Sequence, residues 1–142
     1  KSGIFPNPNA DVGLHEFTYA LFPHTGDYRE GKVVQEAYRL NCPLYGQAVQ
    51  ADQEYRFSFM EIQEENVIAE TLKAAEDGNG VIVRLYEAYG KRGNIHISFA
   101  DKWNVAQTDL PEKEYKLLQQ ENGEVILNMR PFEIKTLRLE HI

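Results

Sequence analysis

The most regular stretch of this 142-residue chain is Ile95-His96-Ile97-Ser98-Phe99. Apolar and polar residues alternate strictly in it, and a period of two is typical of a β-strand with one face toward a core. The same alternation occurs in Tyr55–Phe59, while Val67–Leu72 and Val81–Tyr89 are apolar runs of strand length. These runs predict a mainly β, antiparallel domain.

Turn sequences separate the predicted strands. Asp77–Gly80, Gly90–Gly93 and Asn122-Gly123 each offer Gly or Asn, which accept the positive φ angles that tight hairpins need. About eight strands, short turns and one helix are most economically arranged as an antiparallel β-sandwich.

The last predicted strand changes phase. Phe132 and Ile134 fall on one face, whereas Leu137 and Leu139 fall on the other. Either a β-bulge lies between the two pairs, or both faces of this strand are buried.

The N-terminal part is organised differently. Residues 1–12 include two prolines and predict an irregular lead-in from an upstream part of a longer protein. Residues 14–22 alternate again and predict a strand, with His15, Phe17, Tyr19 and Leu21 on its apolar face. Residues 32–40 carry an apolar stripe at helical spacing and predict one short helix, which Pro43 ends.

Composition excludes several classes of protein. The hydrophobic fraction of 42% predicts a globular chain, and a net charge of −7 argues against a nucleic-acid-binding surface. The single cysteine, Cys42, excludes an intrachain disulfide, and no apolar run is long enough to cross a membrane. The chain starts at Lys1 without an initiator Met, which suits a processed chain or a fragment, and a reducing compartment is favoured.

Local motifs for catalysis are absent from the sequence. The four histidines lie at 15, 24, 96 and 141, so no His-x-His or His-x-Asp pair preorganises a metal, although a site from distant strands stays open. His96 is expected on a solvent-facing side of a strand and His141 at a frayed end. His15 is either a core histidine or a ligand-facing one.

Other candidate groups have structural explanations. Glu64-Glu65 is expected at a solvated corner, and Arg84 and Glu87 fall on opposite strand faces, so each needs a partner elsewhere. Trp103 and the fifteen Tyr and Phe residues form either a core or a sugar-stacking platform.

Five segments together resemble family 38 glycoside hydrolases, the α-mannosidases. The first, residues 10–24 (ADVGLHEFTYALFPH), resembles the opening of that family's C-terminal β-domain in its microbial and cytosolic branch. The others, in order along the chain, are AYRLNCPL (37–44), LKAAED (72–77), VRLYEAYG (83–90) and RPFEIKTL (130–137).

The resemblance implies a fold and a setting. Residues 1–142 would be one C-terminal β-sandwich of the galactose-mutarotase-like, supersandwich type, packed in the same chain against a catalytic α/β barrel and a helical bundle. Family members are metal-dependent, retaining exo-α-mannosidases acting on mannosyl oligosaccharides. The nucleophile and the zinc-type divalent metal belong to the barrel, so this chain would hold neither catalytic residue nor cofactor and would be inactive alone. A cytoplasmic location is implied, with no nucleic-acid or membrane partner, and homo-oligomerisation is left open.

Asp11, Gly13 and His15 are the candidates for the substrate pocket or a domain interface, because they lead from the upstream part into the sheet. The alternative is that Gly13 permits a backbone bend which Asp11 caps. Two other readings of the whole chain remain: a stand-alone carbohydrate-binding module using exposed Trp103 or Tyr side chains, and an oligomerisation module.

Overall fold

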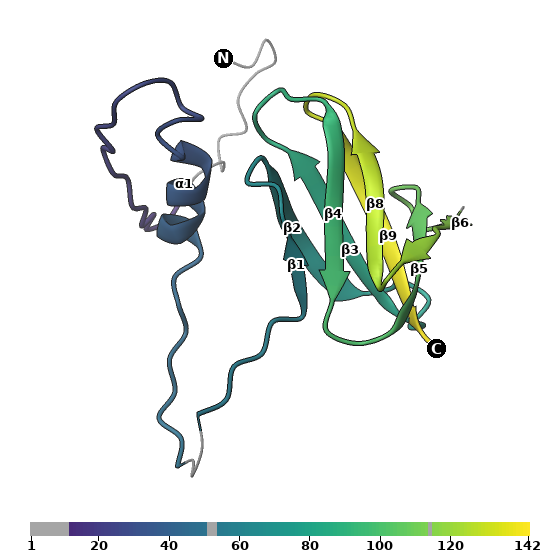
Figure 1. Ribbon diagram of the computed structural model, residues 1–142. Helices are drawn as coiled ribbons and strands as arrows, with labels where there is room; N and C mark the ends of the chain where they lie inside the picture. The colour runs from purple at the N-terminus through teal and green to yellow at the C-terminus, as the bar shows by residue number, and fades with distance from the viewer. Residues whose placement is uncertain (1–11, 51–53, 114) are drawn as a thin grey trace. The chain divides into compact units, whose positions relative to one another are not determined.

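The computed structural model describes residues 12–50, 54–113 and 115–142 (Figure 1). The chain divides into two compact units, Lys1–Leu40 and Asn41–Ile142. Among the described residues no helix has both the length and the apolar content needed to traverse a lipid bilayer.

The first unit contributes the single helix of the described chain. Helix α1 spans Val33–Asn41, which confirms the predicted helix. It follows a turn in which the Asp27 carboxylate accepts hydrogen bonds from the backbone N–H groups of Arg29 and Glu30. It ends two residues before Pro43, because proline disfavours helical geometry in the residue before it.

The strand predicted for residues 14–22 is wrong. This segment is not part of any sheet in the described chain, and Phe17, Tyr19 and Leu21 have exposed fractions of 80%, 82% and 93%. An alternating pattern makes a strand only when a neighbouring strand completes its hydrogen bonds. The described residues provide no such neighbour here.

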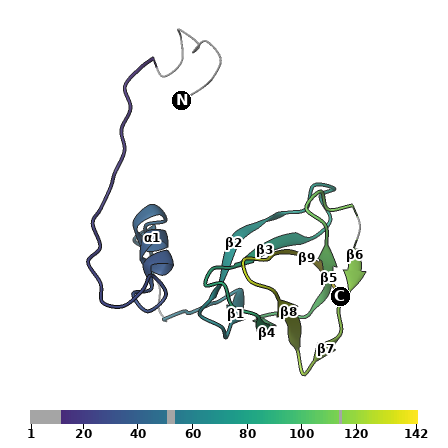
Figure 2. The ribbon, with the colours of Figure 1, turned by 90° about the horizontal axis from the view of Figure 1, so that it is seen from above.

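The second unit is a β-sandwich, as predicted. One sheet has the order β1-β4-β8-β7 and the other β2-β3-β9-β5-β6, with every neighbouring pair antiparallel (Figures 1 and 2). The four-stranded sheet consists of β1 (Met60–Ile62), β4 (Gly93–Phe99), β8 (Glu124–Met129) and β7 (Gln120–Glu121). The five-stranded sheet consists of β2 (Val67–Ala74), β3 (Val81–Glu87), β9 (Ile134–His141), β5 (Trp103–Thr108) and β6 (Tyr115–Leu117).

Apolar side chains from both sheets fill the space between them. The core includes Leu85, Leu137 and Leu139 of the five-stranded sheet and Ile97 and Val125 of the other, and none of these five side chains is accessible to solvent. Ile95 and Ile97, from the stretch that predicted the fold class, both lie in this core.

Two of the three predicted hairpins are present. The turns at Asp77–Gly80 and Asn122-Gly123 join β2 to β3 and β7 to β8, and Asn122 and Gly123 have φ angles of 54° and 82°. Gly90–Gly93 is not a hairpin, because it carries the chain from β3 in one sheet to β4 in the other. A crossing between the sheets cannot be distinguished from a hairpin by turn residues alone.

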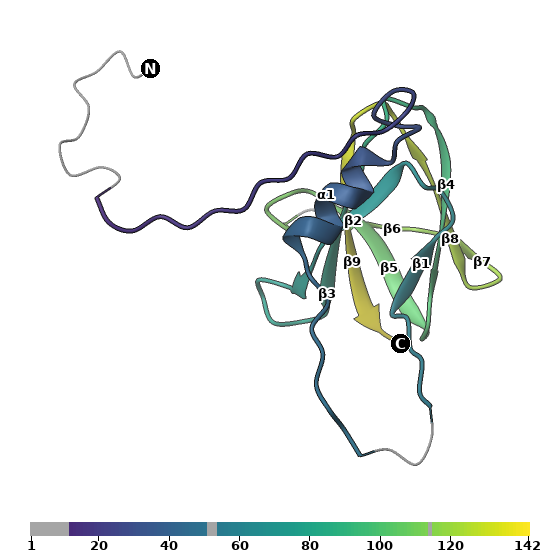
Figure 3. The same ribbon diagram turned by 90° about the vertical axis from the view of Figure 1, so that its left-hand side faces the viewer.

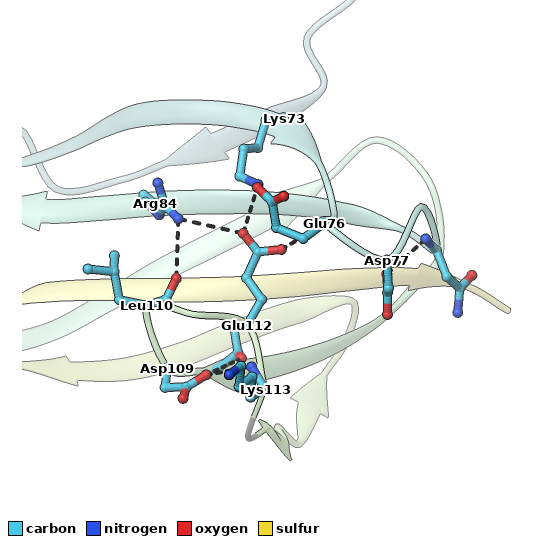
Figure 4. A network of polar contacts seen from close by, with 10 residues as sticks. Lys73, Glu76, Asp77, Arg84, Asp109, Leu110, Glu112 and Lys113 are labelled. Atoms are coloured by element: carbon cyan, nitrogen blue, oxygen red, sulfur yellow. Dashed lines mark hydrogen bonds and ion pairs between the residues drawn. The ribbon is translucent and has the colours of Figure 1, made fainter.

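The phase change near the end of the chain separates exposed from buried apolar residues, since Phe132 and Ile134 are each 66% exposed whereas Leu137 and Leu139 lie in the core. Four consecutive residues of β9, Thr136 to Leu139, are buried. The pairing of β9 with β3 and with β5 runs without a register shift, so the bulge alternative is wrong. The second buried face exists because the connection from β5 to β6 lies over the outer side of the five-stranded sheet (Figure 4).

The strand predicted at Tyr55–Phe59 is displaced toward the C-terminus. Pairing in the sheet is confined to β1, Met60–Ile62, and residues 54–58 precede it as extended chain (Figure 3). Phe59 packs into the sandwich, whereas Tyr55 and Phe57 are exposed.

Candidate functional site

The predicted pocket or interface residues lie in the first unit. Asp11 is outside the described residues. Gly13 has a φ of 136°, which favours glycine, and a side chain added there would meet no atom within 4 Å. His15 is two residues further along an extended, exposed segment. The role proposed for these three residues stays a prediction.

The histidines do not converge. No group of three His, Cys, Asp or Glu side chains with metal-binding geometry occurs in the described chain. His96 lies on the side of β4 opposite the buried Ile95 and Ile97, as predicted, and its Nδ1 lies 2.7 Å from Glu64 Oε1. His141 is not a frayed end, because it pairs with Trp103 in the sheet and its ring lies 4.0 Å from the indole, centroid to centroid.

Trp103 is a core residue. Its exposed fraction is 6%, and it packs edge-on against Phe59 with ring centroids 5.8 Å apart. A sugar-stacking platform requires an exposed ring face. The carbohydrate-binding alternative therefore loses Trp103 and is left with exposed Tyr side chains.

Glu87 organises one end of the sandwich. Its carboxylate is 1% exposed and accepts four hydrogen bonds, each between 2.7 and 3.0 Å long. The donors are the side-chain amide of Asn66 and the backbone N–H groups of Tyr89, Gly90 and Phe132. One carboxylate thus ties together three separate connections: β1 to β2, β3 to β4, and β8 to β9.

These hydrogen bonds determine the chemistry available to Glu87. Burial acts to raise the pKa of its carboxyl, but hydrogen bonds outweigh it and hold the pKa below its ordinary 4.5. The largest of these come from the Phe132 N–H and the Asn66 amide, followed by those from Tyr89 and Lys91. A carboxylate has about four lone-pair positions, and all are used here. Glu87 therefore fixes the loops at this end of the sandwich.

The strained residue at this end is Phe132. Its φ is 57°, an unusual value for an aromatic residue, and its ring is 66% exposed beside Gly90. A side chain on Gly90 would lie 3.0 Å from the Phe132 ring. Glu87, by accepting from the backbone of both residues, holds the two loops in this close approach.

A second buried carboxylate, Glu112, lies over the outer face of the five-stranded sheet (Figure 4). Its Oε1 is 2.8 Å from Lys73 Nζ and 3.5 Å from Arg84 Nη2, and its Oε2 accepts from the backbone N–H of Glu76 at 2.8 Å. Arg84 also donates to the Leu110 carbonyl. Lys73 above all, then the Glu76 N–H, keep the pKa of Glu112 below its ordinary 4.5.

Glu112 was missed by the sequence analysis. It belongs to the connection between β5 and β6 and reaches a partner backbone 36 residues away. Its φ is 62°, an uncommon value for a residue other than glycine. No local signal in the sequence marked it, because its partners Lys73 and Arg84 lie on other strands.

Arg138, on the same outer face, is the centre of another group of ionic contacts. Its side chain is 5% exposed and donates at 2.7 Å to Asp77 Oδ2, to the Asn79 carbonyl and to Glu140 Oε1. These contacts fix the β2–β3 turn to β9. Asp77 is the main reason that the pKa of Arg138 is raised further, so the guanidinium stays charged.

Neither Glu87 nor Glu112 has the environment of a glycosidase acid. A glycosidase requires one carboxylic acid with a raised pKa and a second carboxylate beside the scissile bond. Glu87 and Glu112 both have lowered pKa values and both are engaged by internal donors. Their effect is to hold loops and strands in place.

With the sandwich and its buried carboxylates established, comparison with known proteins identifies the family. Residues 66–137, half of the chain, match the glycosyl hydrolases family 38 C-terminal beta sandwich domain. The chain belongs to this family. The matched residues run from the β1–β2 connection into β9 and include Glu87, Glu112 and their partners, so the family 38 domain is the sandwich itself.

Relatives extend the similarity beyond the sandwich. Alpha-mannosidase G of Dictyostelium discoideum is 29% identical over 97% of the chain, and alpha-mannosidase 2C1 of Mus musculus is 33% identical over 94%. The Saccharomyces cerevisiae alpha-mannosidase is 28% identical over 98% of it. The chain spans only 13%, 14% and 15% of the lengths of these three proteins.

Proposed function

We propose that this chain is the non-catalytic C-terminal domain of a metal-dependent, retaining α-mannosidase that removes terminal α-mannosyl residues from oligosaccharides. The observation that carries the proposal is the family 38 sandwich within a sequence similar to α-mannosidases along nearly all of its length. The domain's partners are the catalytic and helical parts of the same longer protein, and its location is cytoplasmic.

The catalytic metal is assigned to another part of that protein. A divalent ion such as zinc needs several converging His or carboxylate ligands. In the described residues His96 is engaged by Glu64, and Glu87 and Glu112 are each surrounded by donors. This donor set does not fit a metal, and we derive no catalytic step through one in this chain.

Hydrolysis of 4-nitrophenyl α-mannoside tests the proposal. The 142-residue chain and the full-length protein that contains it are assayed side by side, with and without added zinc or cobalt. We expect metal-dependent turnover by the full-length protein and none by the 142-residue chain, whose folded state is verified by circular dichroism. Turnover by the chain alone, or none by a folded, metal-supplemented full-length protein, contradicts the proposal.

His15 is proposed to approach the substrate pocket or a domain interface of that full-length enzyme, together with Asp11 and Gly13. Replacing His15 with Ala in the full-length enzyme is expected to lower turnover while leaving the melting temperature unchanged. Glu16→Ala, next to it, serves as the matched control. An equal loss of turnover and melting temperature in His15→Ala would contradict the role.

A further inference from the structure

The segment before β1 joins that strand through a bend at Phe59 and has no pairing partner in the sandwich. Pairing between β1 and β4 covers Met60–Ile62, and it is closed by the hydrogen bond from Ala100 N–H to the Phe59 carbonyl, 3.0 Å long. Strand β4 ends at Phe99, and the chain then bends toward β5. Residues 54–58 therefore lie beyond the last partner that the four-stranded sheet has on this side.

These residues have two chemically distinct sides. The rings of Tyr55 and Phe57 are stacked on one side, 6.5 Å apart and within 8° of parallel. On the other side Arg56 Nη2 lies 2.7 Å from Glu54 Oε1. Successive side chains of a strand point to opposite faces, so the segment already has the side-chain pattern of a strand.

The aromatic side is continuous with the core. Phe59, the next aromatic residue at this spacing in the sequence, lies at the bend and packs against Phe99 and Trp103 with centroids 6.2 and 5.8 Å away. Tyr55 and Phe57 are 83% and 59% exposed. Three aromatic side chains at this spacing thus lead from inside the sandwich to outside it, where two large apolar surfaces face solvent.

We propose that residues 54–58 form the outer half of a strand that enters a second β-sheet, contributed by the part of the α-mannosidase outside this chain. This inference rests on the proposed function. Tyr55 and Phe57 would be buried on an apolar face of that sheet, and the backbone would pair with its edge strand, as in β-strand addition.

Two observations favour this partner. The relatives align with 94–98% of this chain, yet the chain spans only 13–15% of their lengths, so most of each relative lies outside the aligned region. The Glu54–Arg56 pair neutralises the polar side internally. A partner that offers backbone groups and apolar surface therefore needs no complementary charge.

Amide hydrogen exchange tests the proposal. Exchange at residues 54–58 is followed by mass spectrometry in the full-length α-mannosidase and in the 142-residue chain at two concentrations. We expect exchange at least about tenfold slower in the full-length enzyme, because paired strand amides open only with their sheet. Equal exchange in both proteins overturns the proposal. Slow exchange in the 142-residue chain also overturns the proposal. If that slow exchange depends on concentration, the partner is a second copy of the chain; if it does not, the partner is formed by this chain's own residues.

Matched variants of the full-length enzyme test the side-chain part. Tyr55→Ser with Phe57→Ser should restore fast exchange at residues 54–58, whereas Glu54→Ser with Arg56→Ser should not. Protection that survives loss of both rings overturns the aromatic docking. Because exchange is read independently of mannoside hydrolysis, an inactive enzyme with protected amides would reject the proposed function and not this pairing.

Discussion

Glu87 and Glu112 are both buried carboxylates, but they are stabilised by different partners. Glu87 accepts from one side-chain amide and three backbone N–H groups, all uncharged, whereas Glu112 faces the charged groups of Lys73 and Arg84. The first arrangement fixes loops at one end of the sandwich, and the second fixes a connection over the outer face of a sheet. The difference teaches that uncharged donors can hold a buried charge as firmly as an ion pair.

Loss of Glu87 should have the largest effect. Glu87→Ala leaves one buried and three part-buried donors without this acceptor, so we expect the free energy of unfolding to fall by about 3–5 kcal/mol. Urea unfolding of the 142-residue chain measures this free energy. The matched control is Glu133→Ala at the same end. Glu133 accepts from the backbone and side chain of Arg130 and lies 3.7 Å from Lys135 Nζ, so its loss should cost about 1 kcal/mol. Similar losses in the two variants would show that Glu87 is not the organising group.

Loss of the charge on Glu112 should have a smaller, salt-dependent effect. Glu112→Gln leaves the hydrogen bond from Glu76 N–H possible and leaves Lys73 paired with the Glu76 carboxylate, so we expect a loss of about 1–2 kcal/mol. The loss should shrink between 0.05 and 1 M NaCl, since Lys73 and Arg84 are partly exposed and salt screens their charges. The loss in Glu87→Ala should stay constant over the same range. Equal salt dependence in both variants would remove the distinction between the two carboxylates.

Glu64 has both an uncharged backbone donor and an ionisable partner, the His96 ring. Its loss should have the smallest effect on stability of the three carboxylates. It accepts from the His96 backbone N–H and lies beside the His96 ring, which raises the pKa of that imidazole above 6.5. A raised pKa in the folded state gives stability that is fully present below the unfolded-state pKa and is lost as pH rises through the folded-state value. Nuclear magnetic resonance titration should therefore place the His96 pKa above 6.5, and Glu64→Gln should lower it. An unchanged His96 pKa in Glu64→Gln would exclude the pair as its cause, and His24→Gln serves as the control.

Strands whose partners lie inside the chain were predictable from sequence. Ile95–Phe99 and the Asn122-Gly123 turn carry their own signals, since alternation and positive-φ residues are local properties. Residues 14–22 and Tyr55–Phe57 show the same alternation but no pairing in the described chain, because a pattern cannot reveal whether its partner strand is present.

The polar clusters were less predictable. The opposite faces of Arg84 and Glu87 correctly indicated separate partners, but not which ones. Glu64 was expected at a solvated corner, and it holds His96 instead. Glu112 carries no local signal, because its partners on β2 and β3 come near only after the sheet has formed.

Strand β9 has a consequence for synthesis of the protein. It is the last strand of the sandwich in chain order, yet it lies in the middle of the five-stranded sheet, between β3 and β5. While a ribosome is still translating residues up to His141, β3 and β5 have both emerged without the strand that joins them. The sandwich must therefore close after translation of its final strand, and until then the nascent chain presents two unpaired strand edges to the cell's chaperones.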